Sequence, residues 1–346
     1  MQSFFDLNPQ SLETFCREQD LPRFAADQLV DWVYDKGVAE PEAMTNLSKT
    51  ARTRIAESLR FLTGSIAAHQ VAGDGTQKLL ISWNHATGTS AGQTECVMIP
   101  TEERRTACIS SQVGCPVGCR FCASGLGGVE GNLTAGRIVE QVFRLTHLDG
   151  VGRITNLVFM GMGEPLANFA AVTSAIRTLN APWGFGISAR KITISTVGLP
   201  AAIRKLADFD LPVTLALSLH APNDELRRQL IPWAEYATIA ELLDACGEYF
   251  ARTGREVTLE YLLLRRVNDR VEHAEELAQV ARTLRANVNL IRYNEVKSLP
   301  FDRPTTADVH AFQEVLRKRR VNAHLRASRG RDISAACGQL RHERRD

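Results

Sequence analysis

From about residue 104 onward, short apolar runs alternate with longer stretches whose apolar residues recur at helical spacing. The runs, each the length of one buried strand, are Thr106–Ser110, Asn156–Met160, Lys191–Ser195, Val213–Leu219, Glu256–Leu264 and Val288–Tyr293. The helical stretches are Thr134–Leu148, Phe169–Leu179, Pro200–Ala207, Ile239–Thr253 and Val271–Leu284. This alternation predicts a parallel sheet of strand–helix units. These strands are too few to close an eight-stranded barrel, so we expect an α/β fold, a partial (β/α)6 barrel with its chemistry at the strand ends.

The chain before this region has a different pattern. Residues 1–62 have apolar positions at helical spacing, for example Leu47, Ala51, Ile55 and Leu59, which predicts a small helical accessory domain. Residues 63–100 change to strand-like segments and form a strand-rich connector. We assign residues 101–331 to the partial barrel and residues 332–346 to a C-terminal tail.

Composition indicates an ordinary globular protein. The chain has 346 residues, 44% of them hydrophobic and 23% charged, with a net charge of +2. No run approaches the length of a membrane span, and the first residues do not resemble a signal peptide. Eight cysteines without an export signal predict free thiols or metal ligands in a reducing compartment, so we expect a cytoplasmic protein. Basic residues near the C-terminus, such as Arg317–Arg320, suit a phosphate-rich partner.

Three cysteines lie close together as Cys115-x3-Cys119-x2-Cys122. A 4Fe-4S cluster usually takes four cysteine ligands, so three would leave one iron free to bind a small molecule. Structural zinc is the competing interpretation, with Cys108 as a fourth ligand, although structural zinc usually joins two cysteine pairs across a longer loop. A disulfide framework is typical of small secreted chains and fits poorly. The spacing by itself leaves cluster and zinc open.

Polar residues follow several of the predicted strands. Gly161–Pro165 ends the second strand, Ser195 the third, Ser218–His220 the fourth and Asn294 the sixth. A single serine or histidine in such a place more often bonds to nearby backbone. Because parallel strands end on one rim, several such groups together predict a ligand site there.

The motifs taken together resemble one family. They are Thr94–Pro100, Cys108–Cys115, Asn132–Thr134, Met160–Pro165, Ser218–Asp224 and Asp332–Leu340. Over nearly its whole length the chain resembles the RlmN/Cfr family of radical S-adenosylmethionine (SAM) adenine methyltransferases. The segment Gly128–Gly131 departs from the family pattern, because it lacks the basic residue and the aromatic residue found in most members.

The resemblance implies a role for each matching residue. It assigns a 4Fe-4S cluster to Cys115, Cys119 and Cys122. It assigns contacts with SAM to Gly163, Glu164, Ser195, Ser218, Leu219, His220 and Asn294. It makes Cys337 the cysteine that carries the methyl group, Cys108 its disulfide partner during turnover, and Glu95 the proton acceptor. Glu95 rests on the resemblance alone.

The resemblance also implies the reaction and its partners. Carbon 2 of adenine is electron-poor and does not attack the SAM methyl group, so the methyl first moves to the cysteine that matches Cys337. A radical from a second SAM then activates that methyl group for addition to the ring, and two molecules of SAM are used per turnover. The substrates implied are 23S rRNA, at adenosine 2503, and adenosine 37 of tRNA. An electron donor such as flavodoxin and a monomeric enzyme without a membrane partner are expected.

Two alternatives remain. The strand ending at Asn289–Asn294 is closer to the branch that methylates carbon 8 of the same rRNA adenine, the antibiotic-resistance activity, whereas Met160–Pro165 favours carbon 2. The other alternative is a zinc-stabilised RNA-binding module. The sequence favours methylation of carbon 2.

Overall fold

The computed structural model of the chain describes residues 1–84, 92–284 and 286–340. Within those residues the main sheet has ten strands, in the order β14-β13-β12-β11-β10-β9-β6-β5-β4-β3. The run from β6 to β14 is parallel throughout. It comprises β6 Arg105–Cys108, β9 Asn156–Phe159, β10 Ile192–Thr196, β11 Thr214–Ser218, β12 Thr258–Leu263, β13 Asn287–Arg292 and β14 Ala323–Arg326. The predicted partial barrel is confirmed.

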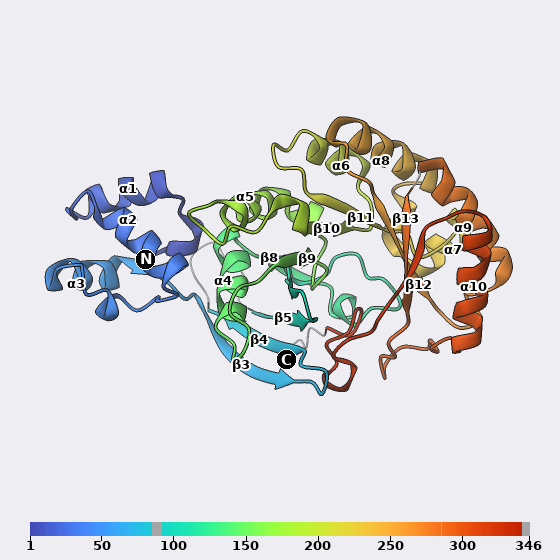
Figure 1. Ribbon diagram of the computed structural model, residues 1–346, viewed down its shortest axis with the longest axis horizontal. Coiled ribbons are helices and arrows are strands. Elements are labelled where there is room, and N and C mark those ends of the chain that lie inside the picture. Colours follow the sequence, from blue (N-terminus) through green and yellow to red (C-terminus); the bar gives the residue numbers. More distant parts are fainter. Residues whose placement is uncertain (85–91, 285, 341–346) are drawn as a thin grey trace.

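Helices cover the outside of this curved sheet (Figure 1). The five that the sequence predicts are present, as α4 Ala135–Thr146, α5 Phe169–Asn180, α6 Pro200–Ala207, α8 Ile239–Thr253 and α9 Val271–Leu284. Two were not predicted, the short α7 Asp224–Leu230 and α10 Thr306–Lys318. The second leads into β14, so the barrel has one strand–helix unit more than expected. Its sequence signal was present, because Thr305 and Asp308 form a capping box at its start.

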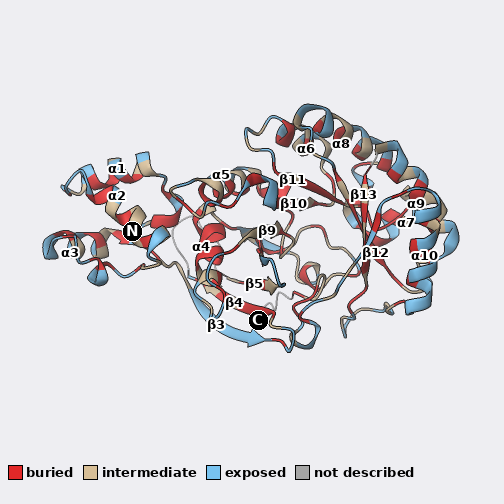
Figure 2. Cartoon of the chain, in the orientation of Figure 1, coloured by how far each residue is buried: buried red, intermediate tan, exposed pale blue. Residues whose placement is uncertain are grey.

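The strands of residues 64–100 belong to the same sheet. β3 Gly64–Val71, β4 Gln77–Trp83 and β5 Gly92–Pro100 are antiparallel neighbours, and β5 pairs with β6. The outermost strand, β3, is largely exposed, whereas β4 and β5 are largely buried (Figure 2). Residues that the sequence assigned to a connector therefore extend the barrel sheet.

The N-terminal helices are α1 Pro9–Glu18, α2 Ala25–Val30 and α3 Lys49–Ser58. Asn8 caps the first of them, where its side chain accepts a hydrogen bond from the Ser11 N–H at 2.9 Å. Residues Asp31–Asp35 continue the second helix as a π-helical turn. Leu59, predicted to be helical, instead lies in β2 Leu59–Arg60, which pairs with β1 Gln2–Ser3.

The helical start is joined to the sheet mainly through α4. Glu140 of this helix is fully buried and accepts hydrogen bonds from the backbone N–H groups of Thr63, at 2.8 Å, and Gly64, at 3.2 Å. It also forms an ion pair with Arg144, at 2.7 Å. Asp6 accepts a hydrogen bond from the Gly136 N–H at the start of the same helix.

The remaining elements are short. β7 Gln112–Gly114 and β8 Val129–Asn132 form a separate two-stranded sheet. Single 3-10 turns occupy Phe4–Asp6, Pro41–Ala43, Ala123–Gly125, Pro165–Asn168, Ala189–Lys191, Pro232–Glu235 and Arg331–Ile333. Among the described helices, none combines the length and the apolarity needed to span a bilayer.

Candidate functional site

The cysteine-bearing loop is held by a small hairpin. The sequence placed it directly after Thr106–Ser110, but β7 intervenes and pairs with β8 on the far side of the loop. The Cys115 N–H donates to the Gly128 carbonyl at 2.9 Å, which closes the loop at its base. At Gly114, whose φ is +74°, a side chain would lie 2.0 Å from that same carbonyl oxygen, so only glycine fits.

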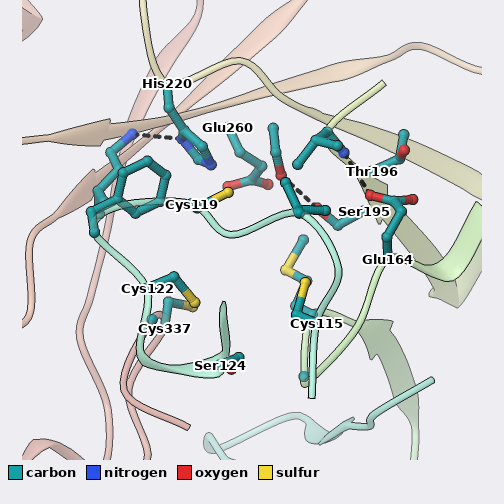
Figure 3. Close-up of a pocket in the computed structure, with 18 of the residues that line it drawn as sticks. Cys115, Cys119, Cys122, Ser124, Glu164, Ser195, Thr196, His220, Glu260 and Cys337 are labelled. Atoms are coloured by element: carbon teal, nitrogen blue, oxygen red, sulfur yellow. Dashed lines mark hydrogen bonds between the residues drawn. The ribbon is translucent and has the colours of Figure 1, made fainter. Parts of the chain in front are cut away.

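Cys115, Cys119 and Cys122 line one cavity, which is open to solvent (Figure 3). Burial raises the pKa of all three thiols, of Cys115 to about 12 and of Cys119 well above its usual value. Uncharged thiols are the form that burial favours, whereas a bound metal cluster takes the thiolates and removes their protons. The donor set therefore fits a group that brings its own positive charge.

Arg227, which the sequence analysis missed, lies against this group of thiols. Burial lowers its pKa to about 10, and the neighbouring Cys119 opposes that shift. Its guanidinium donates to the Leu219 carbonyl at 3.2 Å and to the Val197 carbonyl. It thereby joins the loops that follow β10 and β11 and leaves a cation beside the cysteines.

The cavity does not resemble a site for a single metal ion. Across the described ranges, no group of three or more histidine, cysteine, aspartate or glutamate side chains is arranged to hold one ion. Structural zinc requires four ligands at about 2.0–2.3 Å from one point. Cys108, proposed as the fourth zinc ligand, does not line the cavity. Three thiols that line one cavity would instead suit a cluster that offers several irons.

The glycine-rich segment after β9 packs closely against β7. A side chain at Gly163, whose φ is +101°, would meet the Gln112 side chain at 2.7 Å. The carboxylate of Glu164 is buried, and it accepts hydrogen bonds from the backbone N–H groups of Val197, at 2.9 Å, and Leu166, at 3.0 Å. Burial raises the pKa of Glu164 and these donors oppose the shift. Gly163 and Glu164 both line the cavity.

Three other predicted residues lie at strand ends around the cavity. Ser195 and Ser218 contact each other, with 3.1 Å between their Oγ atoms. His220 accepts a hydrogen bond from the Leu262 N–H at Nδ1, at 3.1 Å, and burial lowers its pKa to about 3. The imidazole is therefore neutral at physiological pH. Leu219 does not line the cavity. Its backbone N–H donates to the Glu260 carbonyl at 3.1 Å.

The tail brings Cys337 to the same cavity. Ala123 and Ser124, just after Cys122, bond to the Gly338 carbonyl, at 2.8 Å, and the Leu340 carbonyl, at 2.7 Å. Cys337 lies beside Cys122 and lines the cavity wall (Figure 3). Asn294 does not line it; its side chain donates to the Cys337 carbonyl at 3.3 Å instead. Residues 341–346 of the predicted tail lie outside the described residues.

Cys108 and Glu95 lie next to the tail, outside the cavity lining. Cys108 shares an apolar cluster with Ala335, and burial raises its pKa to about 12. Both Cys108 and Cys337 are free thiols, so the disulfide partnership during turnover stays a prediction. Glu95 forms a buried ion pair with Lys78 at 2.7 Å, and Lys78 also donates to the Ser334 carbonyl at 3.2 Å.

Sequence reasoning missed two charged residues in the cavity wall, Glu260 of β12 and Arg326 of β14. The pKa of Arg326 is raised mainly by Cys337, with Glu260 and Cys108 adding to the shift. Neither residue belongs to a short motif, and β14 was not predicted. The cavity therefore brings together four thiols, of Cys115, Cys119, Cys122 and Cys337, and polar side chains from β10, β11, β12 and β14.

Comparison with known proteins adds independent findings. The Radical SAM superfamily model matches residues 109–280, and the model of the ribosomal RNA large subunit methyltransferase N-terminal domain matches residues 2–60. The chain is 43% identical over 334 residues to the probable dual-specificity RNA methyltransferase RlmN of Rhodopirellula baltica, covering 96% of this chain and 89% of that protein. It is 46% identical over 341 residues to the protein of the same name from Parasynechococcus marenigrum, covering 96% of each.

A solved structure is similar over the whole chain. The crystal structure of a radical SAM methyltransferase from Sphaerobacter thermophilus superimposes with a TM-score of 0.94 at 42% sequence identity. The match covers 99% of this chain and 100% of that one.

Proposed function

Because this chain belongs to the RlmN family of radical SAM RNA methyltransferases, we propose that it methylates carbon 2 of adenine in two RNAs. The targets are adenosine 2503 of 23S rRNA and adenosine 37 of tRNA. One observation carries the proposal: the thiol of Cys337 lines the cavity that Cys115, Cys119 and Cys122 also line. A methyl group on this sulfur would lie within the site where SAM is bound.

The family implies a 4Fe-4S cluster and SAM, and the donor set fits both. The cluster would be held by Cys115, Cys119 and Cys122. The residues proposed to contact SAM are Gly163, Glu164, Ser195, Ser218, Leu219, His220 and Asn294. When bound, the cluster and two SAM molecules per turnover supply an electron, a methyl group and a radical that removes hydrogen.

The remaining steps belong to side chains of this chain. Cys337 sulfur accepts the methyl group and presents its carbon to the electron-poor adenine ring. Glu95 removes the ring proton after the new carbon–carbon bond has formed. Once the ring has given up this proton and returned the one electron spent on SAM cleavage, the Cys108 thiolate attacks the Cys337 sulfur. A sulfur–sulfur bond forms, the sulfur–carbon bond breaks, and the released methyl carbon keeps the electron pair and takes up a proton. The electron donor then reduces the disulfide before the next turnover. Cys108 shares an apolar cluster with Ala335, two residues before Cys337, which supports the proximity that this attack needs.

The proposed setting follows from the substrates. Exposed basic residues at the end of α10, Arg317–Arg320, are suited to contact RNA phosphates together with the N-terminal helices. We assign the enzyme to the cytoplasm, as a monomer that receives electrons from a flavodoxin-type donor.

The test is a nucleoside analysis of RNA treated with cluster-loaded enzyme, SAM and a reductant. We expect 2-methyladenosine, detected by mass spectrometry of the digested RNA, at both targets. The Cys337→Ala variant should load its cluster normally and form no methylated nucleoside. Appearance of 8-methyladenosine would establish the carbon 8 alternative, and product from Cys337→Ala would refute the methyl-carrier role.

A further inference from the structure

Glu260 has a free carboxyl oxygen inside the cavity. Its side chain is 3% exposed and points into the cavity from β12 (Figure 3). Oε1 accepts a hydrogen bond from the Asn289 side chain at 3.0 Å, whereas Oε2 has no partner among the described residues. A buried acceptor without a donor is costly, so such an atom points to a ligand.

The carboxyl group is held in place before any ligand arrives. Asn289 is its register neighbour on β13 and fixes Oε1. The backbone carbonyl of Glu260 accepts from the N–H groups of Leu219, at 3.1 Å, and His220, at 3.2 Å, which fixes the strand. Oε2 therefore has a defined direction, as a recognition group requires.

The surroundings select the kind of donor. Arg326 lies near enough to Glu260 to interact electrostatically, and Arg227 borders the cysteine loop, so a second cation at Oε2 would be repelled. A neutral N–H donor avoids that repulsion. Phe121, Leu262 and Ile291 line the same cavity and offer apolar contact to the faces of a flat ring. A purine with an exocyclic amino group has both features.

We propose that Oε2 of Glu260 accepts a hydrogen bond from the 6-amino group of an adenine bound in this cavity. The inference rests on the proposed function, which supplies two adenines: that of SAM and that of the target nucleotide. The chemistry of recognition is the same for both. Glu260 thereby becomes a determinant of substrate or cofactor specificity that no motif in the sequence indicated.

The test compares Glu260→Gln with the wild type, both loaded with cluster. In this variant the glutamine carbonyl can still accept the hydrogen bond from Asn289. The glutamine NH₂ group then faces the ligand, so that a donor replaces the acceptor Oε2. Two substrates are used: RNA with the target adenosine, and the same RNA with purine riboside there, which lacks the 6-amino group. The matched control is Glu256→Gln, because Glu256, two residues before β12, accepts from Asn287 of β13 at 3.0 Å but is exposed.

If the target adenine is the ligand, the wild type loses about 10- to 100-fold in kcat/KM on the purine RNA, because the buried Oε2 atom is then left without a donor. Glu260→Gln loses a similar factor on the adenosine RNA and little more on the purine RNA. Its KM for SAM in the RNA-free cleavage reaction then differs from the wild-type value by less than about threefold. If the adenine of SAM is the ligand, Glu260→Gln raises KM for SAM about tenfold or more in that RNA-free reaction.

A change below about threefold in both reactions, as expected for Glu256→Gln, would overturn the proposal. Cluster content, read from the visible absorption spectrum, reports whether each variant is folded. If Glu260→Gln fails to load its cluster, Glu260→Asp, which withdraws the carboxylate by one methylene, replaces it in both reactions. The RNA-free reaction also separates the proposed function from the proposed role of Glu260. If the wild type cleaves SAM but methylates no RNA, the proposed function is refuted. The effect of Glu260→Gln on KM for SAM then tests the role of Glu260.

Discussion

Cys108 is a buried thiol whose surroundings determine how fast it attacks another sulfur. Burial raises its pKa to about 12, Cys337 adds to the shift, and Arg326 opposes it. Only the thiolate attacks, so at neutral pH a small fraction of Cys108 is reactive. The thiolate fraction grows about tenfold for each pH unit below the pKa.

We therefore predict that release of RNA from the covalent adduct accelerates steadily between pH 7 and pH 9. Single-turnover reactions, stopped with denaturant and resolved on a gel, measure the decay of the adduct. The control is Cys246→Ala, since Cys246 is also buried, has a pKa that burial raises to about 12, and lies in α8 outside the cavity lining. A rate that levels off below pH 8 would contradict the assignment of Cys108 as the attacking thiol.

At the scale of elements, Lys78 of β4 ties the proposed base to the tail. Its ammonium group is within 2.7 Å of Glu95 and 3.2 Å of the Ser334 carbonyl, and less than a tenth of either charged side chain is exposed. Removing one partner of a buried pair leaves the other charge uncompensated. We expect Lys78→Met to lower the free energy of unfolding by about 3–5 kcal/mol.

Chemical denaturation of Lys78→Met, Glu95→Gln and the double variant measures this coupling. The double variant should be more stable than the sum of the single changes predicts, because neither charge is then left alone. Lys36→Met is the control: Lys36 and Asp31 form an exposed pair at 2.5 Å, whose loss costs about 0–1 kcal/mol. Strictly additive effects would show that the pair does not couple β4 to β5.

At the scale of the whole molecule, Glu140 joins the helical start to the barrel. Glu140→Ala removes the acceptor of the Thr63 and Gly64 N–H groups and the partner of Arg144. We expect a loss of about 3–5 kcal/mol in the free energy of unfolding and faster proteolysis between residues 58 and 64. Denaturation and limited proteolysis check this. The control is Glu248→Ala, which breaks the half-exposed ion pair with Arg204 and should change the free energy of unfolding by less than about 1 kcal/mol. If both variants lose the same free energy of unfolding, Glu140 has no special role in joining the two parts.

The sequence by itself determined the features that short spacing encodes. The alternation of apolar runs and helical stretches predicted the partial barrel, because strand and helix periods are local properties of the chain. Cys115, Cys119 and Cys122 were identified together, since they occupy one loop. The short strand Ala323–Arg326 was missed because two of its four residues are exposed, so it has no continuous apolar run.

Only the tertiary structure decided which distant residues meet. Lys78 contacts both Glu95 and Ser334, Cys337 lies beside Cys122, and Glu260 lies near Arg326. These meetings depend on the order of strands in the sheet and on the path of the tail across it. The spacing of residues along the chain fixes neither the strand order nor the path of the tail. Both depend on how segments far apart in the sequence pack together in the folded sheet.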